Sequence, residues 1–326
     1  MTKDKTELQK LHRILKENSA FLLTSHQDPD GDSIGSLIGL GRCLKNSGKR
    51  VAIYNQGKTP DKYRFLDPDG AINNINTPPP FSPQVAIVLE CPRYERIGFV
   101  GELITGDMTV VNIDHHVDNE LFGDINLVDT EACAVGEMLF AILRDGGFEV
   151  TPDIANPLYA ALVSDTGCFK FANTNSKCLK VAAELIENGA RPKAIADKIF
   201  LSQAAETFKL LGHVLENLQL YDNGKICVFR LLHSDPGKFG AAMENSEGII
   251  DYSMMINNVQ VGMLFKEVDA ETVKVSLRSQ DGIDICAYAQ KRGGGGHPNA
   301  AGFTFQGQID DAVNTIVAEM TGYLND

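Results

Sequence analysis

The sequence predicts an α/β domain with a mostly parallel sheet flanked by helices, followed by a smaller α+β domain. Three observations support this fold class. Short apolar strands alternate with amphipathic helices through the first half of the chain, which is the pattern of a parallel sheet with helices on both faces. From Lys225 onward, several strand candidates follow one another. The length of 326 residues also exceeds what one hydrophobic core usually supports.

In the first domain, short apolar or β-branched runs predict the strands, and apolar residues at helical spacing predict the helices between them. The runs from Ala20 to Thr24 and from Val110 to Asp114 are the clearest strands. Further strands are expected at 50–54 and 85–89, and helices at 8–15, 34–44, 96–104, 133–143 and 154–163. The segment 73–83 contains four prolines and is expected to be a loop.

The alternation of expected strands and helices is interrupted at 188–192. Helical segments continue to about Leu220, and the next strands are expected at 226–232, 258–265 and 272–277, with helices at 284–291 and 309–323. We therefore expect one domain at 1–189, a helical linker at 190–220 and a second domain at 221–326.

Bulk composition limits the function classes. The net charge of −13 argues against long duplex nucleic acid as a partner, because such binding requires a basic face. The seven cysteines form no C-x-x-C pair, which favours reduced thiols in a cytoplasmic protein over a disulfide or zinc framework. No run approaches about 18 apolar residues, so no membrane span is expected. The N-terminus lacks the apolar core of a signal peptide.

Acidic residues and histidines collect where the expected strands and helices end. His26, Asp30 and Asp32 follow the first strand, Glu90 follows the third, Asp114-His115-His116 end the fourth, and Asp165 ends a helix. The carboxyl ends of parallel strands are where ligands bind in open α/β sheets. Taken singly, Asp32 and Asp165 could be helix caps, and Glu90 could be an edge residue.

Together, these side chains would repel one another without a cation. Mixed carboxylate and imidazole ligands suit Mn²⁺ or Mg²⁺ better than metals that prefer thiolates. The set is too large for one ion, whereas two ions roughly 3.5–4 Å apart, bridged by a carboxylate and a hydroxide, suit phosphoester hydrolysis. The sequence therefore predicts a two-metal phosphoesterase site.

The motifs resemble those of the DHH-family phosphoesterases. Asp114-His115-His116 matches the triplet that names the family, the segment from His26 to Ser36 matches its first motif, and Asp165 matches its last. Arg278-Ser279 and the run from Gly293 to Gly302 resemble the DHH-associated substrate domain. The match covers nearly the whole chain in order, and the two-domain length is that of the nanoRNase, oligoribonuclease and pAp-phosphatase branch.

The resemblance implies a role for each matched residue. His26 and Asp30 would bind one metal, Asp32, His115 and Asp165 would bind the other, and Glu90 would be shared. His116 would face the scissile phosphate, and Asp114 would orient the imidazoles from behind. Two divalent ions are expected, Mn²⁺ rather than Mg²⁺. Glu90 departs from the family, which usually has Asp at this position, and its extra methylene moves the carboxylate by about a bond length.

The glycine run has a physical interpretation as an anion-binding loop, because consecutive glycines let backbone N–H groups approach a phosphate. A flexible linker is the alternative, and the apolar sequence on both sides of the run favours the loop. The second domain would then hold a terminal phosphate while the first cuts the neighbouring ester. The expected substrate-binding residues are Arg278, Ser279, Gly294, Gly295, Gly296 and His297, of which Arg278 and His297 supply charge-assisted hydrogen bonds.

The expected activity is hydrolysis of short oligoribonucleotides to mononucleotides, with pAp as a second substrate. Three alternatives stay open: hydrolysis of linear or cyclic dinucleotides, exonuclease activity on single-stranded DNA, and a non-catalytic nucleotide-binding module. The departure at Glu90 is the only support in the sequence for the last of these. Hydrolysis of inorganic pyrophosphate is disfavoured by the glycine-rich segment that ends in His297.

Overall fold

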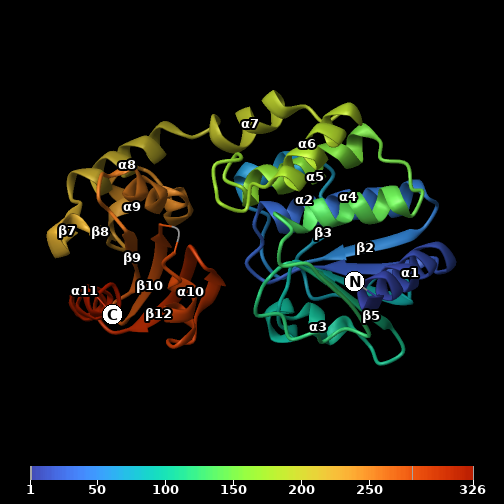
Figure 1. The fold of residues 1–326 in the computed structure, drawn as a ribbon, viewed down its shortest axis with the longest axis horizontal. Helices are drawn as coiled ribbons and strands as arrows, with labels where there is room; N and C mark the ends of the chain where they lie inside the picture. The colour runs from blue at the N-terminus through green and yellow to red at the C-terminus, as the bar shows by residue number, and fades with distance from the viewer. Residues whose placement is uncertain (1, 281, 326) are drawn as a thin grey trace. The chain divides into compact units, whose positions relative to one another are not determined.

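The chain forms two compact units, Met1–Ser202 and Gln203–Asp326. The structure is a computed structural model that describes residues 2–280 and 282–325 (Figure 1). The expected linker at 190–220 contains two helices, α7 (Pro192–Phe200) in the first unit and α8 (Ala205–Glu216) in the second. None of the helices in the described part of the chain has the length and apolar character that a membrane span requires.

The first unit is built on a six-stranded sheet in which each strand pairs with its neighbours in parallel. The strand order is β3-β2-β1-β4-β5-β6. Both β1 and β4 are buried along their whole length, as expected for strands covered on both faces. The strands are β1 (Ala20–Thr24), β2 (Arg50–Tyr54), β3 (Ile72–Asn73), β4 (Val85–Leu89), β5 (Thr109–Asp114) and β6 (Ile125–Val128).

Helices cover both faces of this sheet (Figure 1). On one face, side chains such as Phe21 and Leu23 enter the large core that α1, α2, α4 and α5 share. On the other face, Leu22 packs with Ile97 and Val100. The helices are α1 (Thr2–Glu17), α2 (Gly31–Asn46), α3 (Val100–Leu103), α4 (Val135–Asp145), α5 (Pro152–Asp165) and α6 (Ser176–Glu187), with 3₁₀ turns η1 (Asp61–Leu66) and η2 (Tyr94–Ile97). The predicted α/β class of this part of the chain is confirmed.

The contact between α2 and α5 depends on a missing side chain. A Cβ at Gly35 would lie 2.4 Å from the carbonyl oxygen of Pro157, which is backbone and has little room to move. Glycine at this position therefore lets the two helices approach closely. The close packing fixes both ends of the site described below, because α2 begins at the first acidic motif and α5 ends at Asp165.

The strand order reverses between β1 and β4. From β1 the chain goes first to β2 and β3 on one side, and then crosses to β4, β5 and β6 on the other. In open α/β sheets the connections leave in opposite directions at this point, and a ligand-binding crevice forms outside the carboxyl ends of the two strands. The sequence segments that follow β1 and β4 contain His26 and Glu90.

The second unit contains a mixed sheet in the order β11-β12-β10-β9-β8-β7, with β8 and β9 parallel and the other pairs antiparallel. One face packs against α10 and α11, and the other against α8 and η5. The strands are β7 (Gln219–Tyr221), β8 (Ile226–Leu231), β9 (Val261–Asp269), β10 (Thr272–Ser279), β11 (Gly295–His297) and β12 (Ala300–Gln306). The helical elements after α8 are η3 (Asp222–Gly224), α9 (Asp235–Lys238), η4 (Met243–Ser246), η5 (Ile249–Met255), α10 (Ile285–Gln290) and α11 (Ile309–Tyr323).

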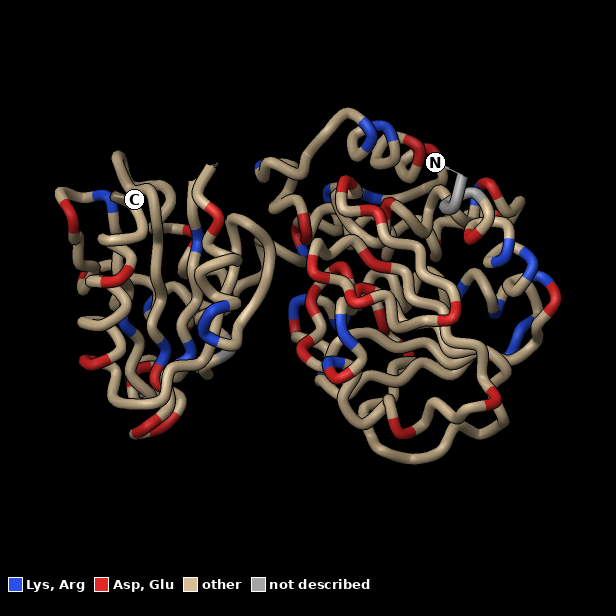
Figure 2. Tube along the Cα trace, turned by 60° about the horizontal axis from the view of Figure 1, so that its bottom comes forward, with Lys and Arg blue, Asp and Glu red and all other residues tan. Residues whose placement is uncertain are grey.

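Five strands were not expected from the sequence: β3, β6, β7, β11 and β12. They contain polar residues or glycines that lower strand propensity, and they form through pairing with a neighbouring strand. The strand expected at 258–265 begins later, at Val261, because Asn258 adopts a left-handed backbone conformation with φ 68°. Acidic and basic residues are both scattered over the two units (Figure 2).

Candidate metal and catalytic site

The site in the first unit lies at the carboxyl ends of β1, β4 and β5 and at the last turn of α5. Most of the polar side chains there are buried, which is unusual for charged groups unless they are paired or bind an ion. The structure brings together all eight residues that the sequence motifs indicated in this unit: His26, Asp30, Asp32, Glu90, Asp114, His115, His116 and Asp165.

The two aspartates of the first motif face different helices. Asp30 is the N-cap of α2 and accepts a hydrogen bond from the backbone N–H of Ser33 at 3.0 Å. Asp32 accepts hydrogen bonds from the N–H groups of Val135 at 2.5 Å and Gly136 at 3.0 Å, at the start of α4. The alternative that Asp32 caps the helix it precedes is therefore wrong, because Asp32 caps a helix about a hundred residues away in the chain.

Glu90 occupies the centre of the group. Its Oε2 lies 2.5 Å from Nε2 of His26 and accepts a hydrogen bond from the Ser33 hydroxyl at 2.8 Å. Its Oε1 lies 3.4 Å from Nε2 of His116 and 3.8 Å from Nε2 of His115. The two oxygens of one carboxylate thus face opposite halves of the site. Glu90 follows the central strand β4, so the alternative of an edge residue is wrong.

The backbone of Glu90 is strained. Its φ of 52° lies in the left-handed region, which costs free energy for a residue with a side chain and persists where the surrounding structure imposes it. The N–H of Glu90 donates to the carbonyl of Ile113 on β5 at 3.0 Å. That hydrogen bond keeps the strained residue attached to the neighbouring strand.

His115 is oriented by a backbone carbonyl. Its Nδ1 lies 3.0 Å from the carbonyl oxygen of Ala132, and because a carbonyl can only accept, Nδ1 is the protonated nitrogen. Nε2 is then the atom available to bind an ion. It lies 3.7 Å from Oδ2 of Asp165 and 4.0 Å from Oδ2 of Asp32. These distances are too long for hydrogen bonds.

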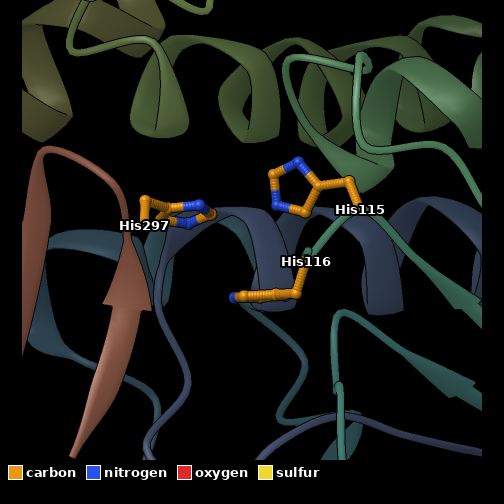
Figure 3. Close-up of side chains that lie close together, drawn as sticks. All are labelled: His115, His116 and His297. Carbon is orange, nitrogen blue, oxygen red and sulfur yellow. The ribbon is translucent and has the colours of Figure 1, made fainter. Parts of the chain in front are cut away.

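His116 is oriented by a chain of side chains. Its Nδ1 donates to Oδ1 of Asp114 at 2.8 Å, and Oδ2 of Asp114 accepts from Asn119 at 2.6 Å. Asn119 also donates to Asn112 at 2.8 Å. Asp114 therefore fixes the ring of His116 from behind, with Nε2 directed to the side of Glu90. The ring planes of His115 and His116 are nearly perpendicular, at 81°. Both side chains are drawn in Figure 3.

Burial and the neighbouring charges shift the pKa values of the carboxyl groups and imidazoles of this site. Burial raises the pKa of Asp32 to about 6, against the opposing effect of His115. Burial also raises the pKa of Asp165 well above its ordinary value. Burial alone would lower the pKa of His116, but Glu90 and Asp114 outweigh it and raise that pKa to about 9. The carboxylates thus favour protons on their histidine neighbours, and a metal cation would supply the same stabilisation.

The donor atoms fit divalent cations. Two groups, His26 with Asp30 and Glu90, and Asp32 with Glu90 and His115, each offer three ligand atoms within 4.8 Å of one another. Ligands about 2.1 Å from one ion lie roughly 3–4.2 Å apart, depending on the angle between them. In addition, Nδ1 of His26 is buried and has no hydrogen-bond partner among the described residues. Glu90 is the member that both groups share.

Sequence reasoning missed several residues that hold this site in place. Ser33 links Ser25 to Glu90 through its hydroxyl, Asn119 holds Asp114, and the carbonyl of Ala132 holds His115. Serine and asparagine are common in loops, and a backbone carbonyl has no sequence signal. Only the tertiary structure reveals these partners.

The residues expected to bind substrate in the second unit lie on β10 and on the hairpin of β11 and β12. Nε of Arg278 donates to Oδ1 of Asp251 at 2.9 Å, so this guanidinium already has an acidic partner. The hydroxyl of Ser279 donates to the carbonyl of Ile283 at 2.6 Å and accepts from Asn299 at 3.0 Å. Both hydrogen bonds of Ser279 are thus used within the unit.

The glycine run is a structured turn and strand. Gly295–His297 pair with Ala300–Gly302 in the antiparallel hairpin, so the alternative of a flexible linker is wrong. A Cβ at Gly294 would lie 2.1 Å from the carbonyl oxygen of Gly302, and one at Gly296 would lie 2.4 Å from that of Ala300. A Cβ at Gly295 would meet no described atom within 4 Å. His297, drawn in Figure 3, ends β11.

Comparisons with known proteins identify the family of the chain. Residues 20–162 match the model of the DHH family, N-terminal domain, and residues 223–326 match that of the DHHA1 domain. The chain is 34% identical over 297 residues to the bifunctional oligoribonuclease and PAP phosphatase NrnA of Thermus thermophilus, covering 90% of this chain and 87% of that one. It is 29% identical to the protein of the same name from Bacillus subtilis, with 91% and 92% covered.

A solved structure has the same fold. The crystal structure of an exopolyphosphatase-related protein from Bacteroides fragilis superimposes with a TM-score of 0.90 and 24% sequence identity, over 99% of this chain and 98% of that one. At this identity the likeness concerns the fold. It extends over both units.

Proposed function

This chain belongs to the DHH family of phosphoesterases, and from that premise we propose that it hydrolyses short oligoribonucleotides to mononucleotides and also removes a phosphate from pAp. Two relatives that the chain matches over about nine tenths of its length are named for these two activities. The motifs of the first unit, a buried group of carboxylates and imidazoles, are suited to phosphoester chemistry.

One observation carries the proposal: the two oxygens of Glu90 face two separate groups of ligand-type side chains. A carboxylate in this position can be shared by two cations. His26 and Asp30 would hold one of them, and Asp32, His115 and Asp165 the other. When bound, the two cations would activate a water for attack on phosphorus and neutralise the charge that develops on the phosphoryl oxygens. Three imidazoles near the site favour Mn²⁺ over Mg²⁺, which prefers oxygen ligands.

The remaining residues of the site orient one imidazole so that it can donate a hydrogen bond or a proton to the substrate. Asp114 holds Nδ1 of His116 and directs Nε2 into the site. The imidazole is thereby placed to donate a hydrogen bond to a phosphoryl oxygen or a proton to the leaving oxygen. Asn119 restrains Asp114 and so keeps the ring in one orientation. Because all three side chains are largely buried, the arrangement costs little reorganisation when substrate binds.

The second unit would select the substrate. Arg278 and His297, with the backbone of Gly294–Gly296, offer donors that suit a terminal phosphate. Asp251 lies against Arg278 and would give up part of that ion pair when a phosphate binds. Basic residues are dispersed among acidic ones in both units (Figure 2), which favours short substrates over long duplexes, because a long duplex requires a continuous basic face.

A product profile tests the proposal. Purified protein with Mn²⁺ is incubated with RNA of two to five nucleotides, DNA of the same length, pAp, and cyclic and linear dinucleotides. We expect mononucleotides from the short RNA and AMP from pAp, at rates higher than on DNA or on cyclic dinucleotides. A clear preference for the dinucleotides would replace the proposed function with the first alternative. No turnover of any substrate, in protein that retains bound metal, would leave a non-catalytic binding module.

We also propose a cytoplasmic location. The cysteines at all seven positions are free, and six of them are buried without a disulfide partner. Free thiols are usual in reducing compartments. Alkylation and mass mapping of protein taken directly from cells would test this, and a native disulfide at any of these positions would contradict it.

A further inference from the structure

A second group of ligand-type side chains lies outside the candidate catalytic site. Cys133 precedes α4, Glu137 lies in the first turn of α4, and Cys178 lies in the first turn of α6. All three side chains are fully buried. One sulfur or oxygen atom from each lies within 4.8 Å of the other two. The two cysteines are far apart in the sequence, so no spacing motif indicates this group.

The donor set differs from that of the catalytic site. Two thiolates and one carboxylate suit Zn²⁺ and similar thiophilic cations, with Zn–S of about 2.3 Å and Zn–O of about 2.0–2.2 Å. Ligand atoms at tetrahedral angles around such an ion lie roughly 3.5–3.8 Å apart. The observed spread therefore requires only a small contraction of side chains that already face one another.

One basic side chain lies beside the group. Nζ of Lys177 lies 2.7 Å from Oε1 of Glu137 and 3.0 Å from Oδ2 of Asp129. Two thiolates, one carboxylate and a divalent cation carry a net charge of −1, and the ammonium of Lys177, which also contacts Asp129, carries the opposite charge. The lysine side chain is half-exposed at 52%, so it can move away from Oε1 and keep its contact with Asp129.

We propose that Cys133, Glu137 and Cys178 bind one thiophilic divalent cation of the Zn²⁺ class. The fourth ligand does not come from these three residues and is a small molecule such as water. Binding releases the protons of both thiols, so affinity falls as the pH is lowered. The site is independent of the two cations proposed for catalysis, because it shares no ligand with them.

The position of this group gives the cation a structural consequence. The carbonyl of Ala132 accepts the hydrogen bond that orients His115, and the N–H groups of Val135 and Gly136 hold Asp32. A cation bound through Cys133 and Glu137 would fix the same short segment from its other side. It would stabilise the placement of two catalytic ligands without touching them.

Cobalt provides a spectroscopic test. Full-length protein is saturated with Mn²⁺, and one equivalent of Co²⁺ is added under reducing conditions. A thiolate bound to Co²⁺ gives a charge-transfer band in the near ultraviolet, which the oxygen and nitrogen ligands of the catalytic site do not give. We expect the band in the unmodified protein and its loss in both Cys133→Ala and Cys178→Ala. The matched control is Cys43→Ala, a buried cysteine in α2, which should keep the band.

Two further measurements keep the test decisive. If either cysteine variant fails to fold, Glu137→Gln is used, and it should bind Co²⁺ at least about tenfold more weakly while the band remains. Absence of the band in the unmodified protein would overturn the proposal, as would an unchanged band in Cys178→Ala. A Cys133–Cys178 disulfide recovered in place of bound metal would show a redox pair instead. None of these outcomes depends on nuclease activity, so failure here leaves the proposed function standing.

Discussion

Replacement of Glu90 by glutamine is the most direct perturbation of the candidate site. The change keeps the size of the side chain and removes its charge. Oε1 and Oε2 lie 2.5–3.8 Å from the imidazole nitrogens of three histidines, so a charge in this position acts at about 4 Å or less. At an effective dielectric constant of about 20, a unit charge at about 4 Å contributes roughly 4 kcal/mol. That free energy corresponds to about a 1,000-fold loss of kcat.

The assay measures steady-state hydrolysis of a trinucleotide RNA with Mn²⁺, together with metal content after gel filtration. Glu90→Gln should lose about one bound ion per chain and about 1,000-fold in kcat, while its circular dichroism spectrum stays unchanged. Glu149→Gln, an exposed glutamate of the same unit, is the matched control and should behave like the unmodified protein. If Glu90→Gln retained both ions and more than a tenth of the activity, a shared carboxylate could not be the basis of this site.

Three further predictions address the positioning residues, the second unit and stability. Asn119→Ala removes the 2.6 Å hydrogen bond to Asp114. Because a hydrogen bond to a charged group contributes about 1.5–3 kcal/mol, kcat should fall about 10- to 100-fold. The metal content should stay unchanged. Arg278→Ala should raise KM for the trinucleotide by a similar factor and leave bound metal unchanged; loss of metal would show that this residue is misassigned. Burial alone would raise the pKa of Asp235, but the hydrogen bond from Lys238 and the other partners outweigh burial and lower this pKa. The ionised carboxylate therefore stabilises the folded state above the unfolded pKa of about 3.9. This stabilisation is lost as the pH falls through the lower pKa of the folded state. Urea denaturation of Asp235→Asn should therefore show a weaker decrease in stability below about pH 4 than the unmodified protein does.

Much of the fold was predictable because its signals are local. The strand at Ala20–Thr24 and the helix at Ile309–Tyr323 have the predicted bounds, since a short apolar run and the helical spacing of apolar residues can both be recognised from neighbouring residues. The membership in the DHH family expected from the motifs is confirmed by the matched domains and relatives. The strand β11 was not predictable, because glycines have low strand propensity and Gly295 pairs only when β12 is present.

The candidate site was predictable as a set of residues and not as a geometry. Adjacent acids and histidines at strand ends indicated which side chains converge. The sequence could not show that Asp32 caps α4, because that contact joins segments about a hundred residues apart. For the same reason, the sequence indicated scattered thiols, whereas the structure brings Cys133 and Cys178 to one buried group. Contacts between distant segments are set by packing, and single-sequence patterns do not record packing.

The central place of Glu90 follows from the register of the sheet. Thr24 on β1 pairs with Val88 on β4, and Leu89 on β4 pairs with Ile113 on β5. His26 and Glu90 each come two residues after a paired position, and Glu90 is level with Asp114. A shift of one residue in the pairing of β4 would displace Glu90 along the sheet and break the hydrogen bond from its N–H to the carbonyl of Ile113. The same reversal of strand order that opens a crevice between β1 and β4 thus places one acidic residue between the first histidine and the histidine pair, which is the position that a shared ligand requires.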